Sequence, residues 1–204
     1  MLVIGLTGGI GAGKSTVSAM LRRRGAIVVD TDEVSRRVVE PGGPAHRAVV
    51  DRFGAGVVGE AGGIDRSALA ALVFTDPAAL ADLNAIVHPA VREVVEGCLA
   101  TEARTDHVVV LDIPLLVESA GAYPTDGVVV VDCPPDLAVR RLVGLRGMDE
   151  SDALRRVAAQ ASREERLAHA DFVILNDATV RDLETQVDAA WTWICSLAPG
   201  PRMS

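Results

Sequence analysis

The chain has 204 residues, of which 49% are hydrophobic and 24% are charged, and its formal net charge is -8. This length and composition suit a single globular domain with an ample buried core. The acidic balance and the absence of a Lys/Arg-rich block argue against nucleic acid as a main partner. No apolar run approaches the ~20 residues needed to span a membrane, so we expect no membrane partner.

Cysteine usage points to a reducing compartment. Cys98, Cys133 and Cys195 lie far apart in the sequence and lack the spacing of metal ligands. We therefore predict reduced thiols in a cytoplasmic protein. We also expect no secretory leader, because the first apolar stretch runs directly into a glycine-rich loop.

The first predicted strand, 2–6, leads into Gly8-Gly9-Ile10-Gly11-Ala12-Gly13-Lys14-Ser15. This G-x-x-x-x-G-K-S spacing is the phosphate-binding P-loop, whose glycines let successive N–H groups face phosphate oxygens. Lys14 can reach the β- and γ-phosphates, and the Ser15 hydroxyl can ligate Mg²⁺. A predicted helix over 14–24 presents its positive end to the same anion. The loop therefore predicts binding of a nucleoside triphosphate with magnesium.

Two carboxylates follow the second predicted strand, 26–29. Asp30 and Asp32 should lie at the carboxyl edge of the sheet, beside the P-loop. A kinase needs a group that orients or deprotonates the attacking hydroxyl, and a carboxylate can do this. Asp is also a favoured helix N-cap, so one of the two can cap the next helix while the other acts in catalysis.

A long and mostly helical insertion occupies residues 32–100, between the second and third predicted strands. It exceeds a plain crossover, so we expect a substrate-facing subdomain. His88 and Pro89 lie inside it. A lone histidine is more often packed or exposed than catalytic, and the proline indicates a helix start or a kink.

The remaining apolar runs complete a sheet. They are short, rich in Val and Ile, and separated by helical segments, which is typical of parallel strands buried on both faces. We predict an α/β fold, a doubly wound parallel sheet with helices on both faces. Asp112 and Asp132 end two of these strands, and either resembles the acidic residue on the magnesium side of P-loop enzymes. The remaining predicted strands cover 107–111, 127–131 and 172–175, and the remaining helices cover 31–39, 44–52, 67–74, 78–100, 136–145, 150–161 and 180–197.

A second insertion, residues 136–170, is rich in arginine. Most of these side chains are expected on solvated helix faces, paired with nearby acids. One or two could instead close over ATP as a lid, because phosphoryl transfer needs cations and exclusion of water. The tail 198–204 is expected to be disordered. The arginines are Arg140, Arg141, Arg146, Arg155, Arg156, Arg163 and Arg166.

Up to about residue 190 the chain resembles the dephospho-coenzyme A kinase family. Single blocks are weak signals, but few other P-loop kinases carry the D-x-D, H-P and P-L-L-x-E blocks in this order. The blocks are Ile4–Thr7 with the P-loop, Val28–Asp32, Arg36, Val39–Gly42, Asp65-Arg66, Leu69, Phe74, Leu83–Pro89, Pro114–Glu118, Ala159-Gln160, Arg166, Ala170-Asp171 and Asn176.

The resemblance implies transfer of the ATP γ-phosphate to the ribose 3′-hydroxyl of dephospho-coenzyme A, giving coenzyme A and ADP. By the family pattern Asp32 would be the base or the positioner of the 3′-hydroxyl, Lys14 would stabilise the transferring phosphoryl beside Thr7, and Arg141 would be the lid cation. His88 and Arg36 belong to the acceptor side. The residues implied for ATP are Gly9, Gly11, Ala12, Gly13, Lys14, Ser15, Thr16 and Asn176, with Ser15 also on the metal.

The lid departs from the family pattern. Family members often have Gln where Ala138 stands and an arginine where Leu145 stands, next to Arg146. Two other readings of the P-loop remain. One is another nucleoside monophosphate or small-metabolite kinase, since fold alone fixes no substrate. The other is a non-catalytic nucleotide switch, against which stands the lack of an N-K-x-D guanine-reading block. The sequence does not indicate an oligomeric state.

Overall fold

The computed structural model describes residues 1–114, 116 and 123–198 of the chain. Leu115, Val117 and Glu118 of the P-L-L-x-E block and most of the predicted tail, 199–204, lie outside the described residues. Five strands in the described part form one sheet, in the order β2-β3-β1-β4-β5. They are β1 (Leu2–Gly8), β2 (Ile27–Asp30), β3 (Val108–Asp112), β4 (Gly127–Asp132) and β5 (Phe172–Leu175).

The described helices follow the predicted pattern closely, and the predicted α/β fold is confirmed. Two short elements, α8 and the 3₁₀ helix η1, were not expected. Helix α5 runs without interruption through Pro89, so the histidine beside it marks neither a helix start nor an end. The helices are α1 (Lys14–Arg23), α2 (Thr31–Arg37), α3 (His46–Phe53), η1 (Ala55–Val57), α4 (Arg66–Thr75), α5 (Pro77–Glu102), α6 (Pro135–Arg146), α7 (Glu150–Ala158), α8 (Arg163–Ala168) and α9 (Val180–Ser196).

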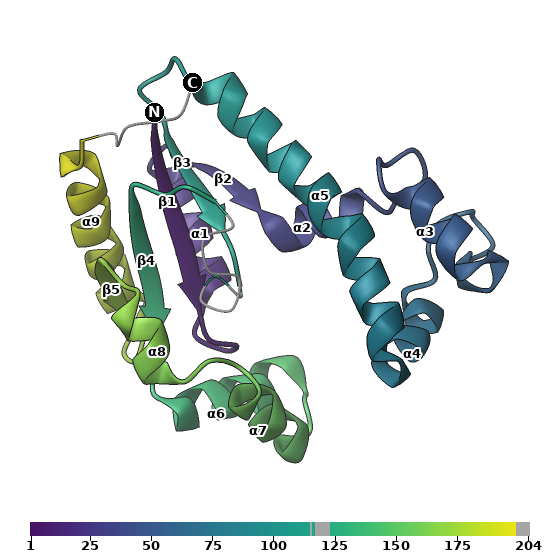
Figure 1. The fold of residues 1–204 in the computed structure, drawn as a ribbon. Helices are drawn as coiled ribbons and strands as arrows, with labels where there is room; N and C mark the ends of the chain where they lie inside the picture. Colours follow the sequence, from purple (N-terminus) through teal and green to yellow (C-terminus); the bar gives the residue numbers. More distant parts are fainter. Residues whose placement is uncertain (115, 117–122, 199–204) are drawn as a thin grey trace. The chain divides into compact units, whose positions relative to one another are not determined.

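Strand β1 lies at the centre of the sheet and pairs in parallel with β3 on one side and β4 on the other. The chain order therefore reverses beside β1, which is the switch point where open α/β sheets place their ligands, beyond the carboxyl ends of the strands. The register sets Leu6 opposite Asp112 and Gly8 opposite Val131. Helices α6, α7 and α8 gather at the carboxyl end of β4 (Figure 1).

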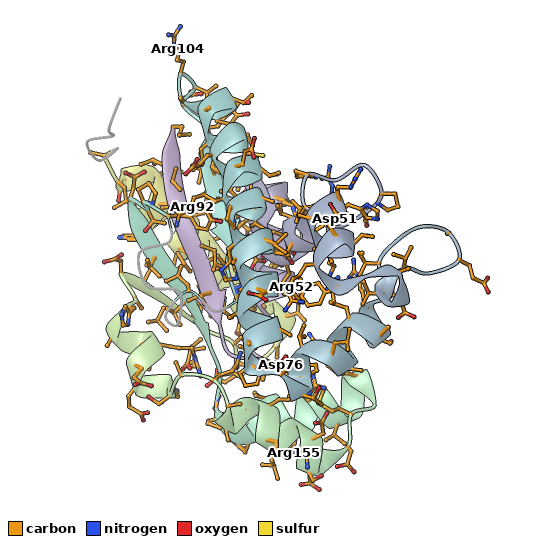
Figure 2. All side chains as sticks on the ribbon, turned by 45° about the vertical axis from the view of Figure 1, so that its right-hand side comes forward. Asp51, Arg52, Asp76, Arg92, Arg104 and Arg155 are labelled. Carbon is orange, nitrogen blue, oxygen red and sulfur yellow. The ribbon has the colours of Figure 1, made fainter. Side chains whose placement is uncertain are left out.

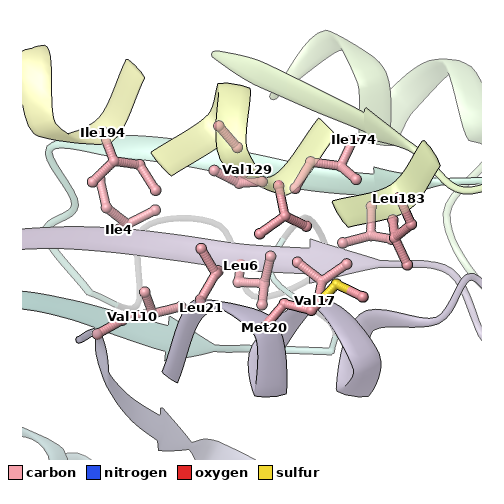
Figure 3. Packing of buried hydrophobic residues seen from close by; sticks show 14 of the residues in the cluster. Ile4, Leu6, Val17, Met20, Leu21, Val110, Val129, Ile174, Leu183 and Ile194 are labelled. Carbon is pink, nitrogen blue, oxygen red and sulfur yellow. The ribbon is translucent and has the colours of Figure 1, made fainter. Parts of the chain in front are cut away.

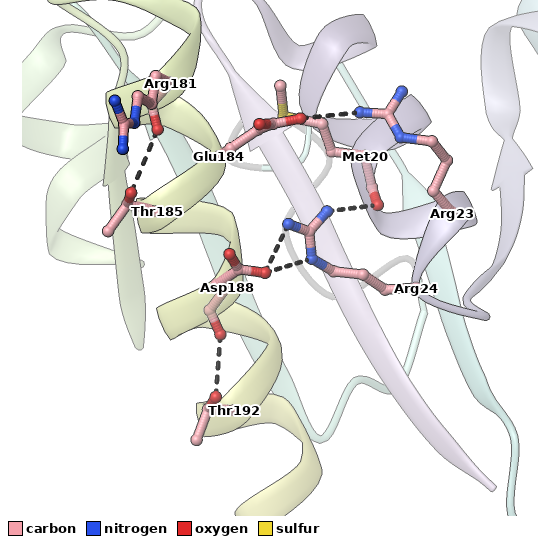
Figure 4. A network of polar contacts seen from close by, with 8 residues as sticks. All are labelled: Met20, Arg23, Arg24, Arg181, Glu184, Thr185, Asp188 and Thr192. Carbon is pink, nitrogen blue, oxygen red and sulfur yellow. Dashed lines mark hydrogen bonds and ion pairs between the residues drawn. The ribbon is translucent and has the colours of Figure 1, made fainter.

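The main core forms where α1 and α9 pack against one face of the sheet (Figure 3). Alternate residues of β1 point to this face, which is why Leu2, Ile4 and Leu6 are buried together. Burial of such side chains contributes about 1.5–3 kcal/mol each and is the main stabilisation of the sheet. Across the α1–α9 boundary, Arg24 binds Asp188 at 2.5 Å, and Arg23 lies 3.6 Å from Glu184 (Figure 4).

The chain divides into two compact units, a sheet unit of Met1–Val29 with Glu102–Ser204 and a helical unit of Asp30–Thr101. The helical unit has its own apolar cluster, built around Val49, Val57, Leu69, Val73 and Ala79.

Charged side chains occupy the exposed surface of the helices. Asp51 and Arg52 on α3, Arg92 on α5 and Arg155 on α7 are exposed (Figure 2). Arg52 also links α3 to α5 through Asp82, at 2.6 Å. Within the described part of the chain, every helix is too short or too polar to span a bilayer.

Candidate functional site

The loop after β1 leads into α1, and the first N–H groups of this helix point to no acceptor among the residues that the structure describes. Gly13 is the N-cap of α1, and no side chain caps the helix. The N–H groups of Gly13, Lys14 and Ser15 make no hydrogen bond with the described part of the chain. Unsatisfied donors at a helix N-terminus, together with the helix dipole, bind anions. The geometry therefore provides a phosphate site at the position that the P-loop motif predicts.

Two glycines of the loop are required by its shape. Gly11 has φ 79° and Gly13 has φ 91°, a left-handed conformation that favours glycine. A Cβ on Gly13 would lie 2.2 Å from Asn176 Nδ2, and one on Gly11 would lie 2.8 Å from the Ala138 carbonyl oxygen. The loop therefore depends on close backbone approach to neighbouring elements as well as on its own turns.

Lys14 contacts the carboxylate of Asp112. Asp112 is 2% exposed and also accepts a hydrogen bond from Ser18 Oγ at 2.5 Å. Two donors satisfy the buried charge, as burial of a carboxylate requires. Asp112 is thus held at the P-loop by two residues of α1. The hydroxyl of Thr7, at the end of β1, donates to the Pro114 carbonyl at 3.3 Å.

Asp132 has a different partner. Arg163, in the first turn of α8, binds both of its carboxylate oxygens, with Nε 3.0 Å from each and Nη2 2.6 Å from Oδ2. The hydrogen bond to Asp132 raises the pKa of the Arg163 guanidinium above its usual value. The sequence could not separate the two strand-end aspartates. The structure separates them, because Lys14 contacts Asp112 whereas an arginine of the second insertion binds Asp132.

Arg141 is half-buried on α6 and binds Asn176 twice. Its Nη1 donates to the Asn176 carbonyl at 3.0 Å, and its Nη2 donates to Asn176 Oδ1 at 3.3 Å. The Asn176 amide continues to the P-loop, where Nδ2 donates to the Ala12 carbonyl at 2.8 Å. Burial raises the pKa of the nearby Cys133 thiol, and the positive charge of Arg141 opposes that rise. The predicted lid cation and the predicted ATP residue Asn176 are therefore in direct contact.

The segment that joins α7 to α8 also reaches the P-loop. Gln160 Oε1 accepts a hydrogen bond from the Ile10 N–H at 2.7 Å. Arg166 Nη2 lies 3.0 Å from where a Cβ on Gly9 would be. These residues and neighbours on β4 and α6 line a small cavity of about 20 Å³ beside the loop. The sequence analysis named Gln160 only as part of the resemblance, and it named Arg166 there and among the arginines that could form a lid, without assigning either a contact.

The other arginines of the second insertion mostly behave as surface charges. Arg155 and Arg156 pair with Asp152 at 3.3 and 3.0 Å, and Arg140 pairs with Asp136 at 3.0 Å. Such exposed pairs contribute little to stability. Arg141, Arg163 and Arg166 are the members of the set whose contacts reach the loop or the strand ends.

In the helical unit, the structure identifies which carboxylate caps α2. Asp30 is the N-cap, and its Oδ1 accepts from the N–H groups of Asp32 at 2.9 Å and Glu33 at 3.0 Å. Asp32 lies in the first turn, and its carbonyl accepts from Ser35 Oγ at 2.9 Å. Arg36 is exposed on the same helix, and His88 is exposed on α5.

The residues around the P-loop fit a magnesium ion that is bound mainly through its nucleotide. Ser15 is exposed in the first turn of α1, and Asp112 supplies a carboxylate at the end of β3, in contact with Lys14. Mg²⁺ prefers oxygen ligands and usually keeps several from phosphate and water. No group of three or more His, Cys, Asp or Glu that could hold a metal without such help occurs among the described residues.

Comparison with known proteins gives a consistent result. The family model described as dephospho-CoA kinase matches residues 2–182. A dephospho-CoA kinase of Streptomyces avermitilis is 50% identical over 208 residues, covering 100% of this chain and 99% of that protein. A Thermus thermophilus crystal structure matches with a TM-score of 0.81 and 37% identity, over 94% of this chain and 97% of the other. A Campylobacter jejuni dephospho-CoA kinase, 21% identical, shares the fold with a TM-score of 0.71, over 95% of this chain and 96% of the other.

Proposed function

The chain belongs to the dephospho-CoA kinase family, and we propose how its residues divide that family's reaction among them. The enzyme transfers a phosphoryl group from ATP to dephospho-CoA, the final step of coenzyme A biosynthesis. The observation that carries the donor half is the uncapped N-terminus of α1 beside Lys14. Such transfer depends on positioning and charge stabilisation rather than on a covalent intermediate.

On the donor side, the backbone of Gly9–Thr16 holds the ATP phosphates. Lys14 moves from Asp112 to the transferring phosphoryl group and offsets its charge. Arg141 supplies a second cation. Two observations support this role: Arg141 binds Asn176 beside the loop, and its guanidinium has further N–H groups besides the two that bind Asn176. Thr7 lies at the end of β1, next to the first glycine of the loop.

On the acceptor side, Asp32 orients and deprotonates the 3′-hydroxyl of the ribose. Support comes from its exposed position in the first turn of α2, a helix whose N-cap is Asp30 rather than Asp32. Arg36 on the same helix and His88 on α5 would bind the acceptor. A carboxylate within hydrogen-bond reach of the hydroxyl can act as its general base.

Magnesium is the expected metal, with Ser15 as a direct ligand and Asp112 on the metal side. When bound with ATP, the ion would supply positive charge that offsets the charge of the phosphates. Contact of Asp112 with both Lys14 and Ser18 supports this choice over Asp132, whose two oxygens bind Arg163. A cytoplasmic location and the absence of a nucleic-acid partner remain predictions from composition.

The test is ADP release from ATP with dephospho-CoA, nucleoside monophosphates or other small hydroxyl compounds as acceptors. Dephospho-CoA should stimulate release strongly, and phosphorus NMR of the product should place the new phosphate on the 3′-oxygen. Equal stimulation by a nucleoside monophosphate would favour the other kinase reading. Tight nucleotide binding with slow, acceptor-independent turnover would favour a switch.

A further inference from the structure

Two amide side chains bind the P-loop backbone on either side of Gly11. Gln160 Oε1 accepts from the Ile10 N–H at 2.7 Å, and Asn176 Nδ2 donates to the Ala12 carbonyl at 2.8 Å. Between these two points lies Gly11, whose φ is 79°. A glycine-rich loop otherwise samples many conformations, so two fixed points next to this turn restrict it strongly.

The partners of Asn176 fix the direction of its amide. The Ala12 carbonyl needs a donor, so it faces Nδ2, whereas the Arg141 guanidinium needs an acceptor, so it faces Oδ1. The Asn176 backbone is held as well, since its N–H donates to the Asp132 carbonyl at 2.7 Å. Asn176 is 8% exposed. Its side chain is therefore bound within the protein, and its described contacts are with the P-loop and α6.

The second fixed point, Ile10, is also held through its side chain, which contacts α6 and α7. The Ile10 side chain packs against a cluster that includes Val139 and Leu142 of α6 and Ala153 of α7, while its N–H binds Gln160. Neither amide uses the N–H groups of Gly13, Lys14 and Ser15. The two bonds thus shape the loop and leave its phosphate-binding donors available.

We propose that Gln160 and Asn176 are positioning residues that hold the P-loop in its phosphate-binding conformation before ATP arrives, with Asn176 also fixing Arg141 to the loop. A loop that is ordered before ATP binds loses less conformational entropy on binding, which favours affinity. The inference rests on the proposed function, because it takes the loop as the ATP site, and it assigns Asn176 a role other than contact with ATP.

The direction of the two hydrogen bonds allows a test that distinguishes positioning of the P-loop from a general contribution to stability. Asn176→Asp keeps an acceptor for Arg141 but loses the donor to Ala12, so the ATP dissociation constant should rise about tenfold. Gln160→Met loses the acceptor for Ile10 and should weaken ATP binding by a similar factor. Gln160→Glu restores an acceptor, and it should bind ATP at least about threefold more tightly than Gln160→Met despite its added charge.

Gln186→Leu is the matched control. Gln186 is also an amide, and it binds both backbone groups of Leu175 at 2.7 Å, next to Asn176 but away from the loop. The Gln186→Leu substitution should lower the melting temperature without changing the affinity for ATP. Calorimetric binding of ATP is the main readout, with the KM for ATP, the KM for dephospho-CoA and the melting temperature beside it. The KM for dephospho-CoA should stay near the parent value in the Gln160 and Asn176 variants.

Three results would overturn the proposal. One is unchanged ATP affinity in folded Gln160→Met and Asn176→Asp proteins. Another is equal affinity of Gln160→Glu and Gln160→Met. The third is a Gln186→Leu protein that weakens ATP binding as much as they do. If Asn176→Asp does not fold, the Gln160 pair decides alone. A parent that binds ATP without phosphorylating dephospho-CoA would contradict the proposed function and would leave this binding test valid.

Discussion

The ammonium group of Lys14 contacts the carboxylate of Asp112, the last residue of the strand beside β1. The lysine belongs to the P-loop and the aspartate to β3, 98 positions later in the chain. Asp112 is buried, and Ser18 satisfies its other oxygen. The contact therefore places the proposed catalytic cation and the proposed metal-side carboxylate at the same end of the sheet.

Asp112→Asn should lower kcat about 100-fold and raise the Mg²⁺ concentration needed for half-maximal rate. The amide keeps the shape but loses the charge that favours a cation. Initial rates at a series of Mg²⁺ concentrations and saturating ATP measure both effects. Asp132→Asn is the control, because Asp132 binds Arg163 rather than Lys14. It should lower the melting temperature and leave the Mg²⁺ dependence near that of the parent. Equal shifts in the two variants would contradict the assignment of Asp112.

Asp32→Asn should bind ATP normally and lose at least about 100-fold in kcat, since an amide cannot accept the proton of the attacking hydroxyl. ATP binding by calorimetry and single-turnover transfer separate the two effects. The control is Asp30→Asn, two positions earlier, because asparagine caps a helix as well as aspartate does. That variant should keep most of the parent's turnover. Near-normal turnover of Asp32→Asn would remove Asp32 from the chemistry.

Local patterns explain why the strands, most helices and the P-loop could be predicted. Apolar runs of β-branched residues, the G-x-x-x-x-G-K-S spacing and the capping aspartates act over a few residues. Helix α8 was missed because its first turn is highly charged and its apolar face is short. A signal was present, since Ser162 and Glu165 form a capping box.

The polar contacts of the site could not be predicted in the same way. Asn176 and Ala12 are 164 positions apart, and Gln160 and Ile10 are 150 apart. The first pair forms because the sheet places the residue after β5 beside the loop after β1, and the second forms because the segment between α7 and α8 returns to that loop. For the same reason the sequence left Asp112 and Asp132 equivalent, since both simply end a strand. The partners that distinguish them lie on α1 and α8.

Asp182 should make the protein's stability depend on pH. Hydrogen bonds from the Thr179 hydroxyl and N–H hold its pKa below the ordinary 3.8. Because the folded pKa is lowered, this stabilisation is fully present above that ordinary value and is lost as pH falls through the folded pKa. Asp182→Ala should therefore lower the free energy of unfolding at about pH 7, by an amount that shrinks toward about pH 3.

Urea unfolding of the parent and Asp182→Ala at the two pH values measures this difference. Glu184→Ala is a suitable control on the same helix, because its pair with Arg23 is exposed on both sides and contributes little. A difference between parent and Asp182→Ala that stays constant across the range would contradict the capping explanation.

Leu142 and Leu145 lie three residues apart on α6, and truncation should destabilise the protein strongly at Leu142 and hardly at all at Leu145. Leu142 is fully buried in the cluster with Val139 and Ala153 that also holds Ile10, whereas Leu145 is 81% exposed. Leu142→Ala leaves a cavity and should lower the free energy of unfolding by about 3 kcal/mol. Leu145→Ala should change it by less than about 0.5 kcal/mol. Urea denaturation at one pH measures both variants.

Because Ile10 joins this cluster to the P-loop, Leu142→Ala should also weaken ATP binding while the protein remains folded. A cavity in α6 and α7 loosens the Ile10 side chain and with it the loop residue whose N–H binds Gln160. Calorimetry well below the unfolding temperature isolates this effect from global unfolding. Reduced stability with unchanged ATP affinity would mean that the cluster supports the helices alone and that the loop keeps its shape without it.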